Sequence, residues 1–208
     1  MSAPSQLALG GTERVVGARD PADHYATPGW LVEAVLDAVA LPRLCGHVLD
    51  AGAGDGRLGR AVVARRGATG ARLYAVEIDP ARRWSGTLLG VERITADFLT
   101  WATERRAEGW QVPFVISNPP FRLWDDFVRA MLPLVTPGGT CLVLGFVNVL
   151  GGQGRASWWR EHPPSAIWLS PRRASFTPDG QTDSLDCCWI EWGPGERRAE
   201  VRWLETER

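Results

Sequence analysis

Two hydrophobic periods alternate along this chain from residue 47 onward. Short apolar runs that end in turns rich in Gly, Asp or Pro are each followed by a segment with apolar residues at helical spacing. The runs are HVLDAG (47–52), ARLYAVEIDP (71–80), RITADFLTW (93–101), FVISNPPF (114–121) and TCLVLGFVNVL (140–150). The helical segments between them are DGRLGRAVVARRG (55–67), ARRWSGTLLG (81–90), ATERRAEG (102–109) and LWDDFVRAMLPLVTPGG (123–139). This alternation predicts five parallel strands in a doubly wound sheet with right-handed crossovers.

The two ends of the chain add to this pattern. SAIWLSP (165–171) and SLDCCWIEWG (184–193) are strand-like runs whose connection lacks a helical period, which predicts an antiparallel hairpin at one sheet edge. Near the other end, Pro28 opens and Pro42 closes a helical pattern of apolar residues. The predicted fold class is therefore α/β, with a mostly parallel, doubly wound, seven-stranded sheet that ends in an antiparallel hairpin.

Length and charge limit the classes of protein that fit this pattern. The 208 residues contain no linker, so we expect a single domain over 1–208, with residues 1–20 as a flexible N-terminal arm. The net charge of -1 excludes a strongly basic protein that coats nucleic acid, although a local basic face remains possible. No signal-peptide pattern and no apolar run of about 20 residues occurs, so we expect a cytoplasmic protein without a membrane span.

The cysteines and histidines are not spaced as metal ligands. The four cysteines form no CxxC pair, and three of them stand in apolar strand-like runs, which is typical of reduced core residues; they are Cys45, Cys141, Cys187 and Cys188. His24 and His162 have no Cys, Asp or His at ligand spacing. We therefore predict no metal site.

The turn after the first strand, VLDAGAGDGRLG, favours a ligand other than a dinucleotide. Gly52, Gly54 and Gly56 let the backbone pass close to a ligand, while Asp50 and Asp55 disfavour a bound pyrophosphate. The spacing differs from GxGxxG, and the Gly-Lys-Ser/Thr of a P-loop is absent from the sequence. In an open α/β sheet ligands bind beyond the carboxyl ends of the strands, so this turn is expected to contact one that is neutral or cationic.

The next two strand ends carry further candidate ligand contacts. Glu77 follows the glycine turn by about 20 residues, where an acid can accept hydrogen bonds from both hydroxyls of a ribose. Asp97 can accept from an exocyclic amine, and Phe98 is a candidate stacking face. Such an acid-lined pocket suits S-adenosylmethionine, whose sulfonium and ammonium groups are both positive. The alternatives are that Asp97 only caps a helix and that Phe98 belongs to the core.

The sequence SNPPF (117–121) follows the fourth strand and is expected to face the same crevice. An exocyclic amine on a conjugated ring is a poor nucleophile because its lone pair is delocalised into the ring. The side-chain carbonyl of Asn118 and the backbone carbonyl of Pro119 could accept its hydrogens and favour the pyramidal form. Pro119 and Pro120 stiffen this loop, and Phe121 can lie against the target ring.

In this order the motifs DAGAGDG, EID, DF and NPPF resemble those of the Rossmann-like, class I S-adenosylmethionine-dependent amino-methyltransferases, in particular small, phage-type N6-adenine DNA methyltransferases. In that family a Tyr/Thr-Pro element beside the methionine end of the cofactor can precede the glycine turn, as HYATPGW (24–30) does here. The segments 151–164, 169–176 and 180–192 also look like the loop and closing hairpin of the phage-type enzymes. The resemblance covers about residues 24–192.

The resemblance implies a role for each matching residue. Residues that would bind the cofactor are Tyr25, Thr27, Pro28, Asp50, Ala51, Gly52, Gly54, Glu77, Ile78, Asp97, Phe98 and Asn118. Residues that would hold the target base are Asn118, Pro119, Pro120 and Phe121. It implies no general base, because an amine that becomes cationic on methylation can lose its proton to solvent afterwards.

The chain departs from the family in having no space for a separate target-recognition domain. Base readout would then come from the 146–165 loop, the N-terminal arm, the arginines of SPRRASF or a partner. Candidate substrate residues are Arg155, Trp158, Arg172 and Arg173. The alternatives are that the tryptophans of the loop pack against the sheet edge and that Arg172 and Arg173 lie in a solvated turn.

The resulting hypothesis is methyl transfer to adenine N6 in DNA, with the base flipped out of its stack. The same four-residue motif fits adenine N6 or guanine N2 in RNA, the side-chain amide of glutamine in a protein, and cytosine N4, although the last more often has Ser or Thr in place of Asn. A catalytically inactive, cofactor-binding subunit of a heteromer is a further alternative. The target sequence and the oligomeric state are not predicted.

Overall fold

The structure is a computed structural model that describes residues 26–39, 46–66, 71–82, 90–176, 186–194 and 200–203. Several sequence predictions lie outside these residues. They are the N-terminal arm (1–20), the tyrosine and histidine before the Thr-Pro element (Tyr25 and His24), Cys45, and most of the predicted helix at 81–90.

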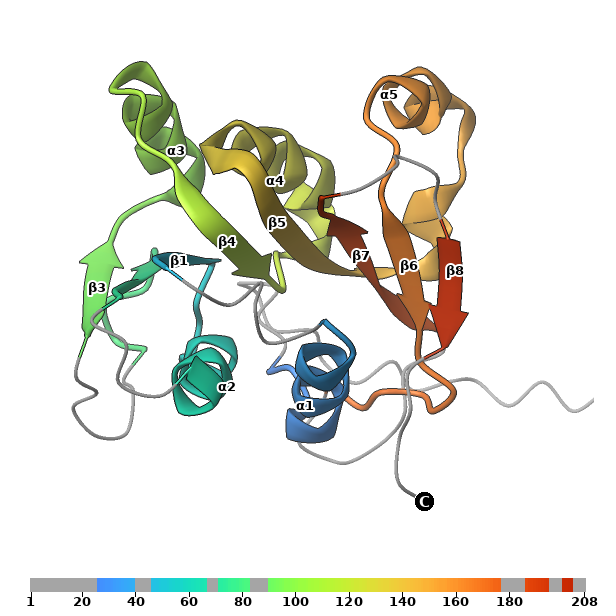
Figure 1. The fold of residues 1–208 in the computed structure, drawn as a ribbon, viewed down its shortest axis with the longest axis horizontal. Helices are drawn as coiled ribbons and strands as arrows, with labels where there is room; N and C mark the ends of the chain where they lie inside the picture. Colours follow the sequence, from blue (N-terminus) through green and yellow to red (C-terminus); the bar gives the residue numbers. More distant parts are fainter. Residues whose placement is uncertain are drawn as a thin grey trace, which may run out of the picture.

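A single sheet organises the described residues (Figure 1), and its eight strands run in the order β3-β2-β1-β4-β5-β7-β6-β8. Its strands are β1 (Val48–Ala51), β2 (Leu73–Glu77), β3 (Val91–Thr95), β4 (Val112–Ser117), β5 (Val135–Phe146), β6 (Ala166–Leu169), β7 (Cys187–Trp192) and β8 (Glu200–Trp203). The first five are parallel, and β7 is antiparallel to both β5 and β6. The α/β class, the parallel sheet and the closing hairpin are confirmed. The strand β8, parallel to β6, was not predicted.

Helices cover both faces of this sheet (Figure 1). On one face lie α1 (Gly29–Ala38) and α2 (Arg57–Arg66), and on the other lie α3 (Phe98–Ala107), α4 (Trp124–Met131) and the short α5 (Ala156–Glu161). Each face has its own hydrophobic core, as expected for a doubly wound sheet.

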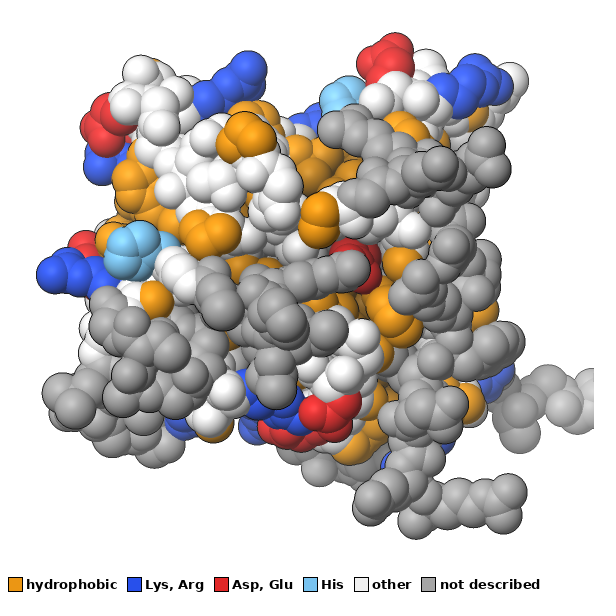
Figure 2. Space-filling view, in the orientation of Figure 1, with side chains coloured by type: hydrophobic (Ala, Val, Ile, Leu, Met, Phe, Trp, Pro, Cys, Tyr) orange, Lys and Arg blue, Asp and Glu red, His pale blue; other side chains and the backbone are white. Residues whose placement is uncertain are grey.

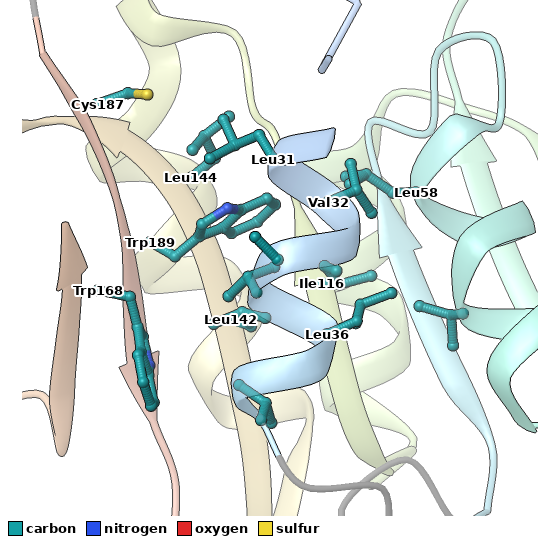
Figure 3. Packing of buried hydrophobic residues seen from close by; sticks show 14 of the residues in the cluster. Leu31, Val32, Leu36, Leu58, Ile116, Leu142, Leu144, Trp168, Cys187 and Trp189 are labelled. Carbon is teal, nitrogen blue, oxygen red and sulfur yellow. The ribbon is translucent and has the colours of Figure 1, made fainter. Parts of the chain in front are cut away.

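The core under α1 shows how a helix and the sheet bury each other. Leu31, Val32 and Leu36 project from α1 toward the sheet, where they meet a surface of buried side chains (Figure 3) that includes Ile116, Leu142, Leu144 and Trp189. Each such side chain contributes about 1.5–3 kcal/mol when it is fully buried.

Arg65 of α2 pairs with two acids of α1, Glu33 and Asp37, and so ties the two helices together.

Two predicted element boundaries were wrong. The third strand ends at Thr95 and α3 begins at Phe98, because the Asp97 side chain accepts a hydrogen bond from Thr100 N at 2.9 Å and caps the helix. The helix predicted to reach residue 139 ends at Met131. A 3-10 turn containing Pro133, which has no N–H to donate, separates it from β5 at Val135.

Three cysteines behave as the sequence predicted. Cys141 lies in β5 and Cys187 and Cys188 lie in β7, all buried and none in a disulfide. Burial disfavours the thiolate, so it raises the pKa of Cys141 and, beside Cys187, raises the pKa of Cys188 to about 12. These thiols therefore serve as small core side chains.

The topology brings the loops after β1 and β4 side by side. These two strands are parallel neighbours, with Asp50 opposite Ile116, yet the chain proceeds from β1 to β2 on one side and from β4 to β5 on the other. The loops that leave such a pair diverge and leave a crevice at the carboxyl edge of the sheet. The predicted glycine turn and the Asn-Pro-Pro-Phe loop are these two loops.

Candidate active site

A cavity of about 360 Å³ lies at this crevice. Ten residues predicted from the sequence line it: Thr27, Gly52, Gly54, Glu77, Ile78, Asp97, Phe98, Asn118, Pro119 and Pro120. The structure therefore brings the motifs after β1, β2, β3 and β4 into one site, together with the residues that precede α1. Further lining residues include Arg57, Asp79, Arg82, Arg122, Leu123 and Phe127, to which the sequence analysis assigned no role.

The glycine turn approaches its neighbours too closely for side chains. Gly52 has a φ of 68°, which is rare for other residues, and a Cβ there would lie 3.3 Å from the Phe127 ring. Glu77 fixes the turn, because its Oε2 accepts from Gly54 N at 2.7 Å and its Oε1 accepts from Asp79 N at 2.9 Å. The carboxylate of Glu77 thus joins the turns after β1 and β2 at the cavity wall.

Asp50 and Ala51 do not line the cavity. Both are fully buried in β1, and Asp50 Oδ2 accepts from Gly59 N at 3.0 Å, in the first turn of α2. Burial raises the pKa of Asp50 to about 7, against the lowering effect of the Gly59 hydrogen bond, and the nearby Glu77 and Asp55 raise it further. Asp50 therefore anchors the glycine turn to α2, and any effect on a ligand passes through that turn.

Arginines balance the acids of the cavity wall. Arg57 is the first residue of α2, and it pairs with Asp55 at 3.3 Å, while Arg82 pairs with Asp79 at 3.3 Å. The sequence predicted an acid-lined pocket, in which these arginines had no role. The position of Arg57, directly after the glycine turn, was the signal that could have identified it. One end of the cavity thus offers charges of both signs next to each other.

Apolar side chains open onto the same cavity. Ile78 is 64% exposed and Leu123 is 40% exposed, although large apolar side chains are normally covered. Phe98, the predicted stacking face, is 3% exposed and its ring lies 4.8 Å from the Phe127 ring, within the core under α3 and α4. A planar ring bound here would therefore find its exposed apolar contacts on Ile78 and Leu123.

The Asn118 loop is held by neighbours on both sides. Ser117 Oγ donates to the carbonyl of Ala51 at 2.6 Å, and Asn118 Nδ2 donates to Thr27 Oγ1 at 2.9 Å. After the two prolines, Leu123 N donates to the carbonyl of Pro120 at 2.9 Å, which closes a 3-10 turn over Phe121–Leu123. With Nδ2 bonded to Thr27, the accepting end of the Asn118 amide is Oδ1, which is buried in the structure.

Phe121 belongs to an aromatic cluster that the sequence analysis missed. Its ring lies 4.0 Å from the Phe146 ring at an angle of 33°, and 5.9 Å from the Phe176 ring at 76°. Phe146 ends β5, at the same sheet edge as Asn118, so its place at a strand end was the available signal. The next residue, Val147, is one of three exposed large apolar residues in the described part of the chain, with Ile78 and Leu123.

Two of the predicted substrate residues are engaged within the fold. Arg155 Nε binds Asp125 at 2.8 and 2.9 Å to its two carboxylate oxygens, which raises the pKa of Arg155. Trp158 is 8% exposed and stacks on His162 at 5.1 Å and 12°. The 146–165 segment itself contains two 3-10 turns, over Val147–Leu150 and Gln153–Arg155, followed by α5. Trp158 thus packs against the sheet, where its ring contacts Trp192 of β7, as the alternative for the loop tryptophans predicted.

Arg172 and Arg173 stand nearer the candidate site. The Arg172 guanidinium lies 4.8 Å from the centre of the Trp30 ring in α1, three residues beyond Thr27. Arg173 pairs with Asp186 at 3.1 Å, and both side chains are more than half exposed. The segment 170–176 therefore runs from the start of α1 to Phe176 beside Phe121. We call it the rim of the site, and it carries two cations, Arg172 and Arg173.

Within the described residues, no group of three or more His, Cys, Asp or Glu side chains is arranged to hold a metal ion. None of the described helices is long and apolar enough to cross a bilayer.

Comparison with known proteins identifies the fold. No protein-family model matches the chain, and no curated protein matches its sequence. Among solved structures, the type I restriction-modification methyltransferase subunit of Streptococcus thermophilus superposes with a TM-score of 0.67 at 16% identity, over 88% of this chain and 48% of that one. The modification subunit of a protein assigned as a type I restriction enzyme of Vibrio vulnificus gives 0.65 at 13% identity, over 88% and 48%.

A third similar structure is closer in length. A protein of Pyrococcus horikoshii, assigned as an RNA methyltransferase, gives a TM-score of 0.62 at 17% identity over 83% of this chain and 87% of that one. The chain spans about half the length of the two type I subunits. At these identities the likeness concerns the fold, and the chain has the fold of the class I S-adenosylmethionine-dependent methyltransferases.

Proposed function

We propose that this protein transfers the methyl group of S-adenosylmethionine to the exocyclic N6 amine of adenine in DNA. The observation that carries the proposal is the position of the Asn118-Pro119-Pro120-Phe121 loop. Its first three residues line the same cavity as the glycine turn and Glu77, and its aromatic faces a cluster of rings. A methyl donor and an amine acceptor would therefore meet at Asn118.

The charges of the cavity support S-adenosylmethionine as the cofactor. Each carboxylate oxygen of Glu77 accepts one backbone N–H, from Gly54 or Asp79, and has a second lone pair for a ribose hydroxyl, while Ile78 with Leu123 offers exposed apolar surface to an adenine ring. Asp55 and Arg57 supply a paired negative and positive group, which match the ammonium and carboxylate of a methionine moiety. The predicted cofactor residues thus suit a nucleoside that carries a sulfonium and the ammonium and carboxylate of methionine.

The protein's part in the chemistry is to position and polarise the acceptor amine. The bound cofactor supplies an electrophilic methyl group. The Asn118 side-chain carbonyl and the Pro119 backbone carbonyl accept hydrogen bonds from the two N–H groups of the amine. These bonds localise the nitrogen lone pair, which points toward that methyl group. Pro119 and Pro120 hold these acceptors stiffly, so little reorganisation is needed. Phe121 lies against the ring, and the product cation loses its proton to solvent.

The acceptor is proposed to be DNA from the shape of the rim and from its charges. Phe121 and Phe146, which are half-buried and contact the buried Phe176, offer aromatic surface for a base that has left its stack, and Arg172 and Arg173 are placed to meet phosphates. On the face seen in Figure 2, arginines and acids of the described residues are interspersed, and no broad basic surface is formed. Contact of this face with nucleic acid would therefore be local, and long-site recognition would need the N-terminal arm or a partner.

RNA is the second candidate acceptor. The Pyrococcus horikoshii structure, assigned as an RNA methyltransferase, is similar over most of its own length. Adenine N6 and guanine N2 present the same kind of amine to Asn118, and the side-chain amide of glutamine in a protein is a chemical relative. An inactive cofactor-binding subunit, in contrast, would not require the stiff loop and its oriented amide.

The first prediction is methyl transfer that depends on Asn118. Purified protein is incubated with isotopically labelled S-adenosylmethionine and, in parallel, duplex DNA, single-stranded DNA, RNA and a protein extract, and the modified species is identified by mass spectrometry. We expect N6-methyladenine from DNA, and loss of transfer by about 100-fold or more in Asn118→Ala. Label in RNA or glutamine would overturn the acceptor, and an Asn118→Ala variant with near wild-type turnover would overturn the role of the loop.

The second prediction separates the cofactor site from the acceptor site. Glu77→Gln keeps the size of the side chain but removes the charge that favours two hydroxyl donors, so we expect the Kd for S-adenosylmethionine to rise by roughly 10-fold or more. Titration calorimetry measures this directly. The matched control is the same change at an exposed acid of α3, Glu104→Gln, which should leave this Kd unchanged, and Asn118→Ala should lower methyl transfer far more than it changes this Kd. Unchanged affinity in Glu77→Gln would mean that the ribose lies elsewhere.

A further inference from the structure

We propose that Thr27 is a positioning residue that sets the orientation of the Asn118 amide, so that the carbonyl oxygen and not the nitrogen meets the target amine. This inference rests on the proposed function. The resemblance to known methyltransferases implied only a cofactor contact for Thr27, whereas the structure places its hydroxyl on the catalytic loop. The contact spans 91 residues of sequence and joins the start of α1 to the end of β4.

Thr27 is held rigidly enough for this role. It is 4% exposed, and it precedes Pro28, which restricts the backbone of Thr27 to extended conformations. The carbonyl of Pro28 in turn accepts from Leu31 N at 3.0 Å, so the following residues begin α1 directly. The Thr27 carbonyl accepts from Arg57 Nη1 at 3.1 Å, which ties it to α2. Two helices therefore fix the position of the hydroxyl.

The orientation of the Asn118 amide decides whether the loop can act on an amine. An asparagine side chain has a donating and an accepting end of nearly equal shape, and only the accepting end can bind an N–H of the target. In the structure Nδ2 donates to Thr27 Oγ1 at 2.9 Å. This bond engages Nδ2, so the target amine would meet the other end of the amide, Oδ1, which is buried in the structure at a residue that lines the cavity. Loss of the hydroxyl would allow the amide to rotate.

Two variants of Thr27 separate the hydroxyl from the shape of the side chain. Thr27→Val keeps the branched shape and removes the hydroxyl, while Thr27→Ser keeps the hydroxyl and removes the methyl group. We expect kcat for transfer to DNA to fall about 10- to 100-fold in Thr27→Val, as for the loss of one positioning hydrogen bond. The Kd for S-adenosylmethionine should change much less than kcat, and Thr27→Ser should recover most of the wild-type kcat.

A spectroscopic readout makes the test independent of activity. The chain contains only two asparagines, Asn118 and Asn148, and four glutamines, so the side-chain amide region of a nitrogen-15 correlation spectrum is simple. The Asn118→Ala variant identifies the Asn118 resonance pair by its absence. We expect this pair to shift or broaden in Thr27→Val and to return toward its wild-type position in Thr27→Ser.

Each outcome decides one of the two proposals. An Asn118 pair that is unchanged in Thr27→Val would overturn the positioning role, as would parallel losses of kcat and cofactor affinity that Thr27→Ser does not restore. A wild-type protein that methylates none of the four acceptors would overturn the proposed function. In that event the amide spectra would still show whether Thr27 orients Asn118.

Discussion

At the scale of single residues, polar side chains in the cavity wall and behind it hold the loops of the site in place. Glu77 accepts from the glycine turn, Thr27 accepts from Asn118, and Asp50 accepts from the first turn of α2. Asp50 differs from the others because it is fully buried and its Oδ1 accepts no hydrogen bond among the described residues. An ionised carboxylate at such a place is costly, so folding favours its protonated form.

This cost predicts a dependence of stability on pH. The pKa of Asp50 is raised from 3.8 to about 7, so its contribution to stability is fully present below pH 3.8 and is lost as the pH rises toward 7. Asp50→Asn removes the titration and can still accept from Gly59 N. We expect thermal unfolding to show a Tm gain of Asn over Asp that is larger at pH 8 than at pH 5.5, by roughly 3 °C or more, since 1 kcal/mol shifts a domain of this size by about 2–4 °C.

The control for this prediction is an exposed acid. Asp126 is exposed on α4, and Asp126→Asn should change Tm by a similar small amount at both pH values. A difference between Asp50→Asn and the wild type that stays constant from pH 5.5 to 8 would show that Asp50 keeps its ordinary pKa. The role of the carboxylate as an anchor of α2 would remain, because that role needs only an acceptor.

At the scale of elements, the 146–165 segment after β5 packs against the rest of the fold. Its helix α5 is fixed by Trp158, which contacts Trp159, His162 and Trp192 with ring centres 4.9–6.0 Å apart. The Arg129 guanidinium of α4 lies 5.1 Å from the centre of the Trp158 ring, on the face of the sheet that α3 and α4 cover. A side chain so enclosed cannot leave to fill the gap of a flipped base without dismantling α5.

We therefore expect Trp158→Ala to act on stability. Removal of a large buried ring typically costs about 3–5 kcal/mol, and urea unfolding should show a loss of this size. Trp158→Phe, which keeps an aromatic ring, should lose less, and methyl transfer per folded molecule should remain close to that of the wild type. If Trp158→Ala unfolds like the wild type but loses transfer, Trp158 belongs to the substrate surface after all.

The elements also show how far sequence reasoning reaches. Strand ends were predictable because each apolar run ends in Gly, Asp or Pro, and parallel strands expose these ends at one edge; Gly52, Glu77 and Asn118 were found in this way. The pairing of Arg155 with Asp125 was not predicted, because the two residues lie 30 apart in the sequence, where no periodicity signals a contact. Phe146 stands at a strand end, but its contact with Phe121 and that of Phe176 depend on the strand order, which the sequence pattern does not give.

At the scale of the whole molecule, charge is balanced overall and concentrated locally. The net charge is -1, and many arginines are paired with acids, as Arg65 is with Glu33 and Asp37. Binding to nucleic acid should therefore be weak in its nonspecific part and depend on few phosphate contacts. The rim segment with Arg172 and Arg173 is the place where such contacts would lie beside the aromatic cluster.

The salt dependence of DNA binding tests this arrangement. Each phosphate contact releases condensed counterions, so log K decreases with log[salt]. The magnitude of this negative slope decreases by about 1 when one contacting arginine is removed. We expect this decrease for Arg172→Ala and again for Arg173→Ala, measured by fluorescence anisotropy with a short labelled duplex. Arg106→Ala is the matched control, since Arg106 is exposed near the end of α3 that points away from the cavity, about 12 Å along the helix from Phe98. Equal slopes in the wild type and the three variants would mean that the duplex approaches another face. A decrease confined to Arg172→Ala and Arg173→Ala would place the DNA backbone beside Phe121 and Asn118.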